Sequence, residues 1–192
     1  MRPNRETIRR FQSLIALALV ASAEALCQEK QANSRPTIEN SLLERRIVVS
    51  IPDRKLALIE DGRVVKIYRT AVGAPESPTP SGAYTIVDRV PNPTWYGPAG
   101  KVVGPGKDNP IGTRWLGLSR KGYGIHGTNV PSSIGRRASH GCIRMRNRDV
   151  EDLFRRVAVG DVVELHRERD SEIARIFGGA ESVAFVAMAG GE

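Results

Sequence analysis

An Asp-Gly pair between two strand-length segments is the feature that most constrains how this chain can fold. Residues 55–60 and 63–68 are rich in aliphatic side chains, and Asp61 and Gly62 stand between them. Such a pair readily adopts the positive φ values of a two-residue type I′ turn, which suits the twist of an antiparallel hairpin. The sequence therefore predicts a β-hairpin, and the fold must contain an antiparallel pair of strands.

Short strand-like segments also occupy much of the chain on either side of the hairpin. They are predicted at residues 46–51, 83–90, 113–119, 123–125 and 161–165. Proline and glycine dominate a long loop at 91–110, and loops of that length usually carry function or are mobile. Many short strands with a single clear helix favour a mainly β domain at residues 45–166.

One segment has the period of a helix instead of that of a strand. Apolar side chains from Val150 to Val157 recur at positions i, i+3, i+4 and i+7, which places them on one helix face. Asn147 is the predicted N-cap, and Gly160 is predicted to end the helix.

The N-terminus has the order of a secretory signal peptide. Four arginines up to Arg10 precede an apolar stretch at 14–21, and small residues in the A-x-A pattern follow at 21–25. A basic region, a short apolar region and a small-residue cleavage site predict a signal peptide at 1–25. The protein is therefore expected to be exported, to the periplasm or the cell envelope.

The segments that flank the predicted domain are polar or charged. Residues 26–44 show no clear period and are predicted to be a linker. Residues 167–192 are predicted to be a C-terminal tail outside the core, with a short helix near 173–177. No apolar run reaches the roughly 18 residues that span a bilayer, so no transmembrane anchor is expected.

The charge of the chain limits its partners. Without residues 1–25 it keeps 25 basic and 19 acidic side chains, a formal net charge of +6. Nucleic acid is an improbable partner for an exported protein, and the aromatic and glycine signatures of RNA-binding modules are absent from the sequence. A carboxylate-bearing substrate or an anionic envelope surface fits a positive field better, and simple solubility explains it equally well.

Cysteine usage singles out one residue. The chain has only Cys27 and Cys142. Exported proteins usually pair their cysteines in disulfides, but Cys27 lies in the polar segment or is removed with the signal peptide, so a bridge to Cys142 is poorly motivated. A lone thiol in an oxidising compartment is a candidate nucleophile.

Two histidines accompany Cys142. A free thiol with a pKa of about 8.5 is largely protonated at neutral pH, so a nucleophilic cysteine needs a base or a cation nearby. His140 shares a face with Cys142 only if the backbone between them is extended. We favour His126 as the base, brought to the sulfur by a hairpin-like return. The Gly127 carbonyl could then hold its Nδ1 proton, and amides near Gly141 could form an oxyanion hole.

These residues carry a resemblance to a known family. Segments 125–128 and 139–145 resemble the signature of the L,D-transpeptidase catalytic domain family, also called YkuD-type domains. Further segments agree with that family in order and spacing at 78–82, 92–96, 104–112 and 113–116. The resemblance covers about residues 46–166, and it implies that family's β-sandwich with one helix after the catalytic cysteine.

The resemblance implies acyl transfer on the peptide stems of bacterial peptidoglycan, without a metal or another cofactor. Cys142 would be the nucleophile that forms a thioester, His126 its proton partner, and the Gly127 carbonyl the group that orients His126. The residues that would bind substrate or shape the site are Ser139, His140, Gly141 and Arg144. Arg144 stands where family members carry asparagine, which leaves the preferred acceptor or carboxylate open.

The family's donor is a tetrapeptide stem, cut between its third residue, often meso-diaminopimelate, and the terminal D-alanine. An amine of another stem or of an envelope lipoprotein would then resolve the thioester. An L,D-carboxypeptidase, which uses water instead, is an alternative. A non-catalytic wall-binding module on the same fold is another.

Two further classes fit less well. A zinc site on His126, His140 and Cys142 has enough ligands for an open tetrahedral centre, but structural zinc requires a fourth ligand, and the usual ligand spacing is absent from the sequence. A sortase also places its histidine before its cysteine, but at a far longer spacing.

Trp95 and Trp115 are predicted to pack in the core, with a place in a substrate cleft as the alternative.

Overall fold

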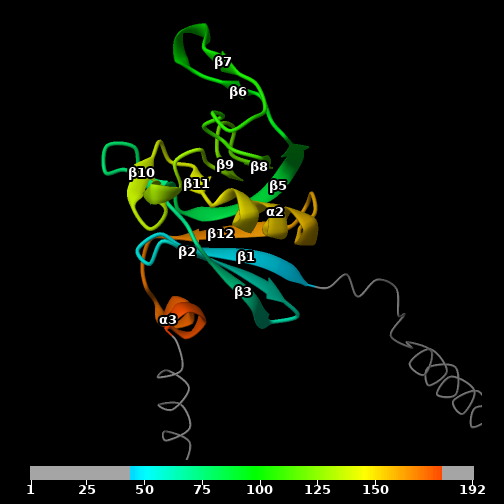
Figure 1. The fold of residues 1–192 in the computed structure, drawn as a ribbon. Helices are drawn as coiled ribbons and strands as arrows, with labels where there is room; N and C mark the ends of the chain where they lie inside the picture. The colour runs from blue at the N-terminus through cyan, green and yellow to red at the C-terminus, as the bar shows by residue number, and fades with distance from the viewer. Residues whose placement is uncertain (1–43, 179–192) are drawn as a thin grey trace, which may run out of the picture. The chain divides into compact units, whose positions relative to one another are not determined.

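A computed structural model describes residues 44–178 (Figure 1). The main element within these residues is an eight-stranded sheet in the order β11-β9-β8-β5-β12-β1-β2-β3. The signal peptide predicted at 1–25, Cys27, and all but the last residue of the linker predicted at 26–44 lie outside the described residues. Residues 179–192 also lie outside them.

The strands confirm a mainly β fold. The large sheet contains β1 (Arg45–Ser50), β2 (Lys55–Glu60), β3 (Arg63–Arg69), β5 (Gly82–Pro91), β8 (Arg114–Leu118), β9 (Gly124–His126), β11 (Ile143–Arg144) and β12 (Val162–His166). Two small sheets pair β4 (Val72–Gly73) with β10 (Arg137–Ser139) and β6 (Trp95–Tyr96) with β7 (Val102–Val103). The helical elements are η1 (Pro98–Gly100), η2 (Pro131–Ser133), α2 (Asn147–Arg156) and α3 (Ser171–Phe177).

The predicted hairpin is confirmed. β2 and β3 are antiparallel, and Glu60 pairs with Arg63 across the turn. Asp61 and Gly62 both have positive φ, at 50° and 72°, as a type I′ turn requires.

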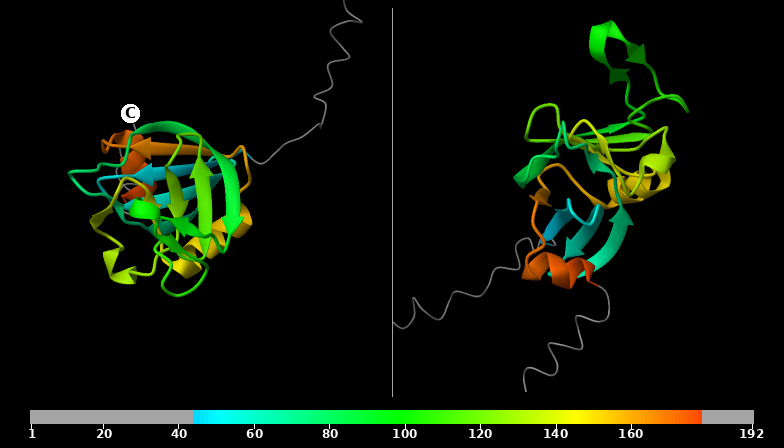
Figure 2. Two further views of the ribbon diagram at one scale, coloured as in Figure 1. Left: turned by 90° about the horizontal axis from the view of Figure 1, so that it is seen from above. Right: turned by 90° about the vertical axis from the view of Figure 1, so that its left-hand side faces the viewer.

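β5 joins the two halves of the large sheet. Its first residues, Gly82–Thr85, pair with β12, whereas Ile86–Pro91 pair with β8. The sheet curls at this strand (Figure 2), so β8, β9 and β11 face β1 and β2 across one hydrophobic core. The predicted two-layered architecture is thus formed by a single curled sheet.

Helix α2 closes this core on one side. Val150, Leu153 and Val157 are buried on the face predicted from their spacing. The predicted boundaries are wrong, because Arg146 is the N-cap and the helix ends at Arg156, before Gly160. Asn147 is the first helical residue, and its side chain is used elsewhere, as described below.

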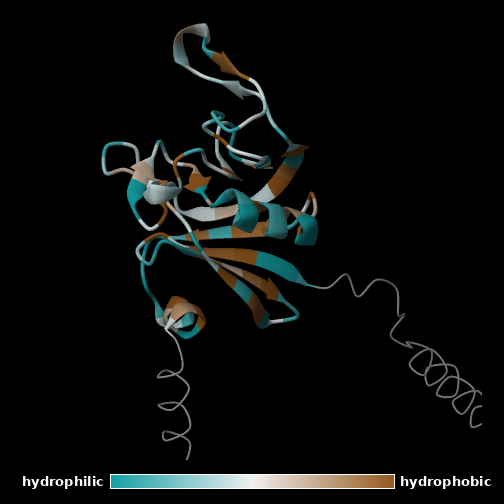
Figure 3. Ribbon diagram, in the orientation of Figure 1, coloured by the Kyte–Doolittle hydropathy of each residue, from teal (hydrophilic) through white to brown (hydrophobic). Residues whose placement is uncertain are grey.

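Helix α3 packs on the opposite face of the sheet. Ile173 and Phe177 are buried against Val48, Ala57 and Ile59 of β1 and β2, and Figure 3 shows the hydrophobic residues on both sides of this contact. The predicted short helix is confirmed, but its predicted place outside the core is wrong for Ser171–Phe177. The sequence alone did not reveal the second apolar face of β1 and β2 that α3 covers.

An ion-pair bridge reinforces this contact. The Arg46 guanidinium contacts Glu164 of β12 at 2.8 Å and Glu172 of α3 at 2.6 Å. One side chain of β1 thereby links its neighbouring strand to the helix. Neither α2 nor α3, the α-helices within residues 44–178, is long and apolar enough to cross a membrane.

The packing of α3 predicts its contribution to stability. Ile173→Ala should lower the free energy of unfolding by about 2–4 kcal/mol, because it empties a fully buried site. Ile176→Ala, on the half-buried side of the same helix, should cost about 1 kcal/mol. Urea denaturation of both variants measures the difference. Equal and small effects would mean that α3 does not belong to the folded core.

Candidate active site

The pairing of β9 with β11 separates the core residues from the candidate site. These short strands are parallel, with Ile143 opposite Ile125 and Arg144 opposite His126. Because side chains alternate along a strand, both isoleucines enter the core while His126 and Arg144 lie on the opposite face. β8 extends the row, since Trp115 pairs with His126.

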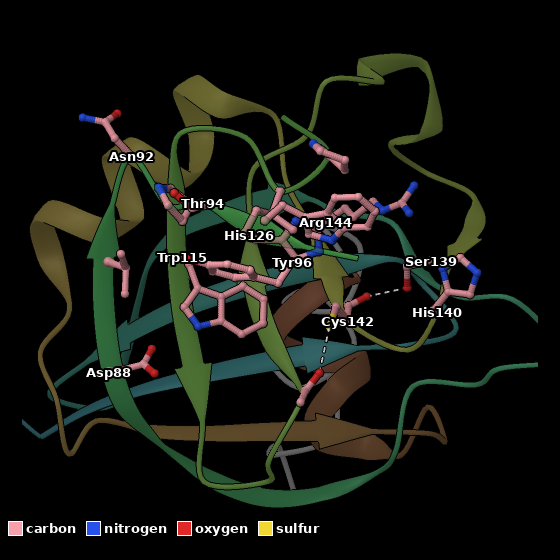
Figure 4. Close-up of a pocket in the computed structure, with 16 residues that line it drawn as sticks. Asp88, Asn92, Thr94, Tyr96, Trp115, His126, Ser139, His140, Cys142 and Arg144 are labelled. Carbon is pink, nitrogen blue, oxygen red and sulfur yellow. Dashed lines mark hydrogen bonds between the residues drawn. The ribbon is translucent and has the colours of Figure 1, made fainter. Parts of the chain in front are cut away.

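Cys142 lies on the same face as His126. It directly precedes β11 and is two residues before Arg144, as Gly124 is two residues before His126. Cys142, His126 and Arg144 line one cleft, with a volume of about 890 Å³ (Figure 4). The structure thus brings together the two residues that the sequence selected as nucleophile and base.

The chain does not return from His126 to Cys142 as a hairpin. It crosses through η2 and β10, which pairs with β4, so that β11 runs parallel to β9. The predicted hairpin-like return is therefore wrong, although it led to the right pair of residues.

A tight turn positions Cys142. The Ser139 hydroxyl accepts a hydrogen bond from the Gly141 N–H at 3.1 Å and donates to the Cys142 carbonyl at 2.5 Å. Gly141 has φ of 105°, and a Cβ there would lie 2.7 Å from the ring of Tyr123, so the turn requires glycine. His140 and Cys142 both lie in this turn and not in an extended strand, and His140 is exposed at the cleft.

This turn narrows the oxyanion-hole hypothesis. The Gly141 N–H is already engaged by Ser139, so it is not free to stabilise an oxyanion in this arrangement. The Cys142 N–H therefore remains as the candidate donor for an oxyanion hole. Ser139 lines the cleft, but its hydrogen bonds serve to hold the turn.

The His126 ring is buried and fixed by its neighbours. Its Nδ1 lies 2.6 Å from the Gly127 carbonyl oxygen, and the ring stacks on Trp115 with centroids 5.8 Å apart. A carbonyl can only accept, so Nδ1 carries the proton in the neutral ring and Nε2 is left as an acceptor. The predicted contact between His126 and Gly127 is present, and its tautomer is the one that a general base needs.

Burial keeps both reactive groups neutral. Loss of solvent lowers the pKa of His126 to about 4, with the Gly127 hydrogen bond opposing and the charge of Arg144 assisting this shift. Burial also raises the pKa of Cys142 above its usual value, against a backbone hydrogen bond from Gly124 and the charge of Arg144. At neutral pH the site therefore holds a thiol and an imidazole, and the thiol lies 3.6 Å from the Gly122 carbonyl.

Asn147 stabilises the loop that orients His126. Its Oδ1 accepts from the Thr128 N–H at 3.0 Å, and a Cβ on either Gly112 or Gly127 would lie 2.2 Å from this oxygen. The two glycines thus leave the space that the amide occupies. Sequence reasoning missed this role because Asn147 also fits the pattern of a helix cap.

Arg144 brings an uncompensated positive charge to the cleft. No acidic side chain among residues 44–178 lies within 4 Å of its guanidinium, and its buried Nε has no hydrogen-bond partner among these residues. Buried or half-buried cations are normally paired. An anionic group of a bound molecule would supply the missing partner.

The long loop after β5 and one acidic residue complete the cleft. Trp95 and Trp115 both line it, so the alternative to core packing is the correct one for these residues. Asp88 of β5 also lines it, which sequence reasoning missed because nothing in the sequence distinguishes this acid from others on the surface. No group of three or more His, Cys, Asp or Glu residues suited to a metal ion occurs between residues 44 and 178.

Comparisons with known proteins agree on one family. The sequence profile described as the L,D-transpeptidase catalytic domain matches residues 44–165. A protein of Bacillus licheniformis named as the L,D-transpeptidase YkuD is 45% identical to this chain over 131 residues. The match covers 68% of this chain and 71% of that protein. The YkuD protein of Bacillus subtilis is 42% identical over 121 residues, or 63% of this chain and 65% of that protein.

Solved structures share the fold. An L,D-transpeptidase from Mycobacterium smegmatis superimposes with a TM-score of 0.56 at 21% identity, over 65% of this chain and 59% of that one. The catalytic domain of the Enterococcus faecium L,D-transpeptidase gives a TM-score of 0.54 at 25% identity, over 66% of this chain and all of that one. The predicted fold class is therefore confirmed.

The neutral state of the site predicts how the thiol reacts. The rate of Cys142 alkylation by iodoacetamide should rise steadily from about pH 6 to pH 9, because the thiolate fraction is small and grows with pH when the thiol pKa is raised. Peptide mass mapping would follow Cys142 separately from Cys27. A rate that is already constant between about pH 5 and pH 8 would contradict this prediction, since it would reveal a stable thiolate–imidazolium pair.

Proposed function

The chain belongs to the L,D-transpeptidase catalytic domain family, and on this basis we propose that it transfers tetrapeptide stems of bacterial peptidoglycan through a thioester on Cys142. The observation that carries the proposal is one cleft that holds the Cys142 thiol, the oriented His126 ring and the unpaired Arg144. Each of these groups has a task in acyl transfer.

In the first step His126 acts as a general base. As Sγ of Cys142 attacks the carbonyl carbon of the third stem residue, Nε2 of His126 takes the thiol proton. The amide bond to D-alanine breaks, and the imidazolium returns the proton to the leaving amine. The Gly127 carbonyl stabilises the imidazolium and keeps the ring in position.

In the second step an amine resolves the thioester. It attacks the acyl carbon, His126 takes a proton from the amine, and the sulfur leaves and regains a proton as the thiol. An amine of another stem would give a cross-link, and a lysine of an envelope lipoprotein would give an attachment. We propose the peptidoglycan stem as donor and one of these amines as acceptor.

The setting of this reaction is the cell envelope. The signal peptide predicted at 1–25 would export the chain to the periplasm or cell envelope, where peptidoglycan is cross-linked. The catalytic domain proposed at 45–166 would then take part in cell-wall organisation and cell shape. The net positive charge of the chain suits an anionic polymer.

A direct assay tests the proposal. Purified disaccharide tetrapeptides should release D-alanine and form linked products, both seen by mass spectrometry. Cys142→Ala should lower turnover to less than about one thousandth, and His126→Gln should lower it about 100- to 10,000-fold. Undiminished turnover by the Cys142→Ala variant would rule out the mechanism. Tripeptide as the sole product would identify an L,D-carboxypeptidase, and binding without turnover a wall-binding module.

Arg144 is proposed to bind the carboxylate of the terminal D-alanine. Loss of this charge-assisted hydrogen bond in Arg144→Ala should raise the donor KM about 10-fold or more. The alkylation rate of Cys142 should fall by a smaller factor, because Arg144 is a minor influence on the thiol pKa. Arg148→Ala, which removes an exposed arginine, is the control. Equal losses of donor use and alkylation would contradict this assignment.

A further inference from the structure

Asp88 of β5 is the one acidic residue, among residues 44–178, whose side chain lines the cleft. β5 is three strands away from β11 in the sheet, so Asp88 and Cys142 lie toward opposite sides of the cleft (Figure 4). Trp115 lies between them. The negative charge is therefore distant from the reacting sulfur but faces the same space.

The backbone of β8 holds the Asp88 carboxylate in place. Its Oδ1 accepts a hydrogen bond from the Gly117 N–H at 3.0 Å. A Cβ on Gly117 would lie 2.3 Å from Oδ1 and 2.8 Å from Oδ2, so the carboxylate rests against a position that only glycine leaves open. This contact orients the side chain before any ligand binds.

The Asp88 charge has no cation opposite it. Within residues 44–178 its hydrogen-bond partner is the Gly117 amide, and no lysine, arginine or histidine lies within 4 Å. Asp88 is exposed, and an ionised carboxylate can accept about four hydrogen bonds, so the rest of its capacity is open to water or to the cation of a ligand. The cleft thus has one fixed negative group and, at Arg144, one unpaired positive group.

We propose that Asp88 binds the ammonium group at the end of the third side chain of the donor stem. This inference rests on the proposed function and makes Asp88 a specificity residue for diamino acids at that position. The terminal D-alanine carboxylate would lie toward Arg144 at the β11 edge of the sheet. The two charges together set the direction in which the donor lies across the strands.

Such a side chain is long enough to reach from Cys142 to Asp88 across the strands that lie between them. Neighbouring strands lie about 4.8 Å apart, and the Asp88 carboxylate extends from β5 onto Gly117 of β8, so it lies two to three spacings, about 10–14 Å, from β11. An acyl carbon lies about 3–3.5 Å from an attacking sulfur. The terminal nitrogen of diaminopimelate or lysine is six bonds further, about 7 Å. A hydrogen bond to the carboxylate adds about 2.8 Å, so the extended chain reaches about 13 Å from the sulfur, which is enough to bring the ammonium to Asp88.

Trp115 supplies the surface between the two ends. A Cβ on Gly124 would lie 2.6 Å from the indole ring, so the ring rests on this glycine of the neighbouring strand. An indole face is a suitable floor for the methylene groups that join the acyl carbon to the ammonium. A diamino acid would thus meet apolar surface along its chain and a carboxylate at its end.

Matched donors test the inference. Two tetrapeptides are compared, one with lysine in the third position and one with N-acetyl-lysine, which has the same chain without the charge. In the Asp88→Asn variant the amide oxygen can still accept from Gly117, so the substitution removes only the charge. We expect its KM for the lysine donor to rise about fivefold with little change in kcat, and its KM for the acetylated donor to stay near that of the unsubstituted protein.

The controls separate this inference from the proposed function. Glu168→Gln removes an exposed acid that does not line the cleft and should change neither KM. An unchanged preference for the lysine donor in Asp88→Asn, or an effect confined to the acceptor KM, would overturn the role of Asp88 while turnover still supported the proposed function. Absence of turnover with either donor, and with disaccharide tetrapeptides, would overturn both.

Discussion

The parallel pairing of β9 with β11 is the constraint on which the candidate site depends. Each strand contributes one isoleucine to the core, Ile125 and Ile143, and burial of both fixes the register. A slip by one residue would turn the isoleucines into the cleft and His126 into the core. The hydrophobic effect thus positions the reactive groups, although none of them is itself hydrophobic.

Burial has a second consequence for the chemistry. It removes water from His126 and Cys142, which disfavours the charged form of each, so that the pair rests as imidazole and thiol. In the mechanism that we propose, the thiol is activated during attack, when its proton moves to a ring already held by the Gly127 carbonyl. The sequence led us to expect a base or a cation beside the sulfur, and the neutral pair is consistent with the general-base role that we propose for His126.

The sequence predicted what depends on local chemistry. The Asp61-Gly62 turn and the spacing that buries Val150 and Leu153 follow from backbone and side-chain preferences over a few residues, and the structure contains both. The crossover to β11 and the packing of α3 were not predicted, because they depend on pairing between segments far apart in the chain. Asn147 was misassigned for the same reason, since its partner lies in another loop.

Several glycines in this site leave space that the side chains of other elements occupy. The Asp88 carboxylate rests against Gly117, and the Trp115 indole rests on Gly124. Asn147 likewise fills the space beside two further glycines. A sequence motif records only that a position is glycine, whereas the fold reveals which polar or aromatic group needs the missing Cβ. The side chains that contact these glycines come from β5, β8 and α2. The cleft is therefore organised by close contacts between these elements and the glycine backbone as much as by the cysteine segment.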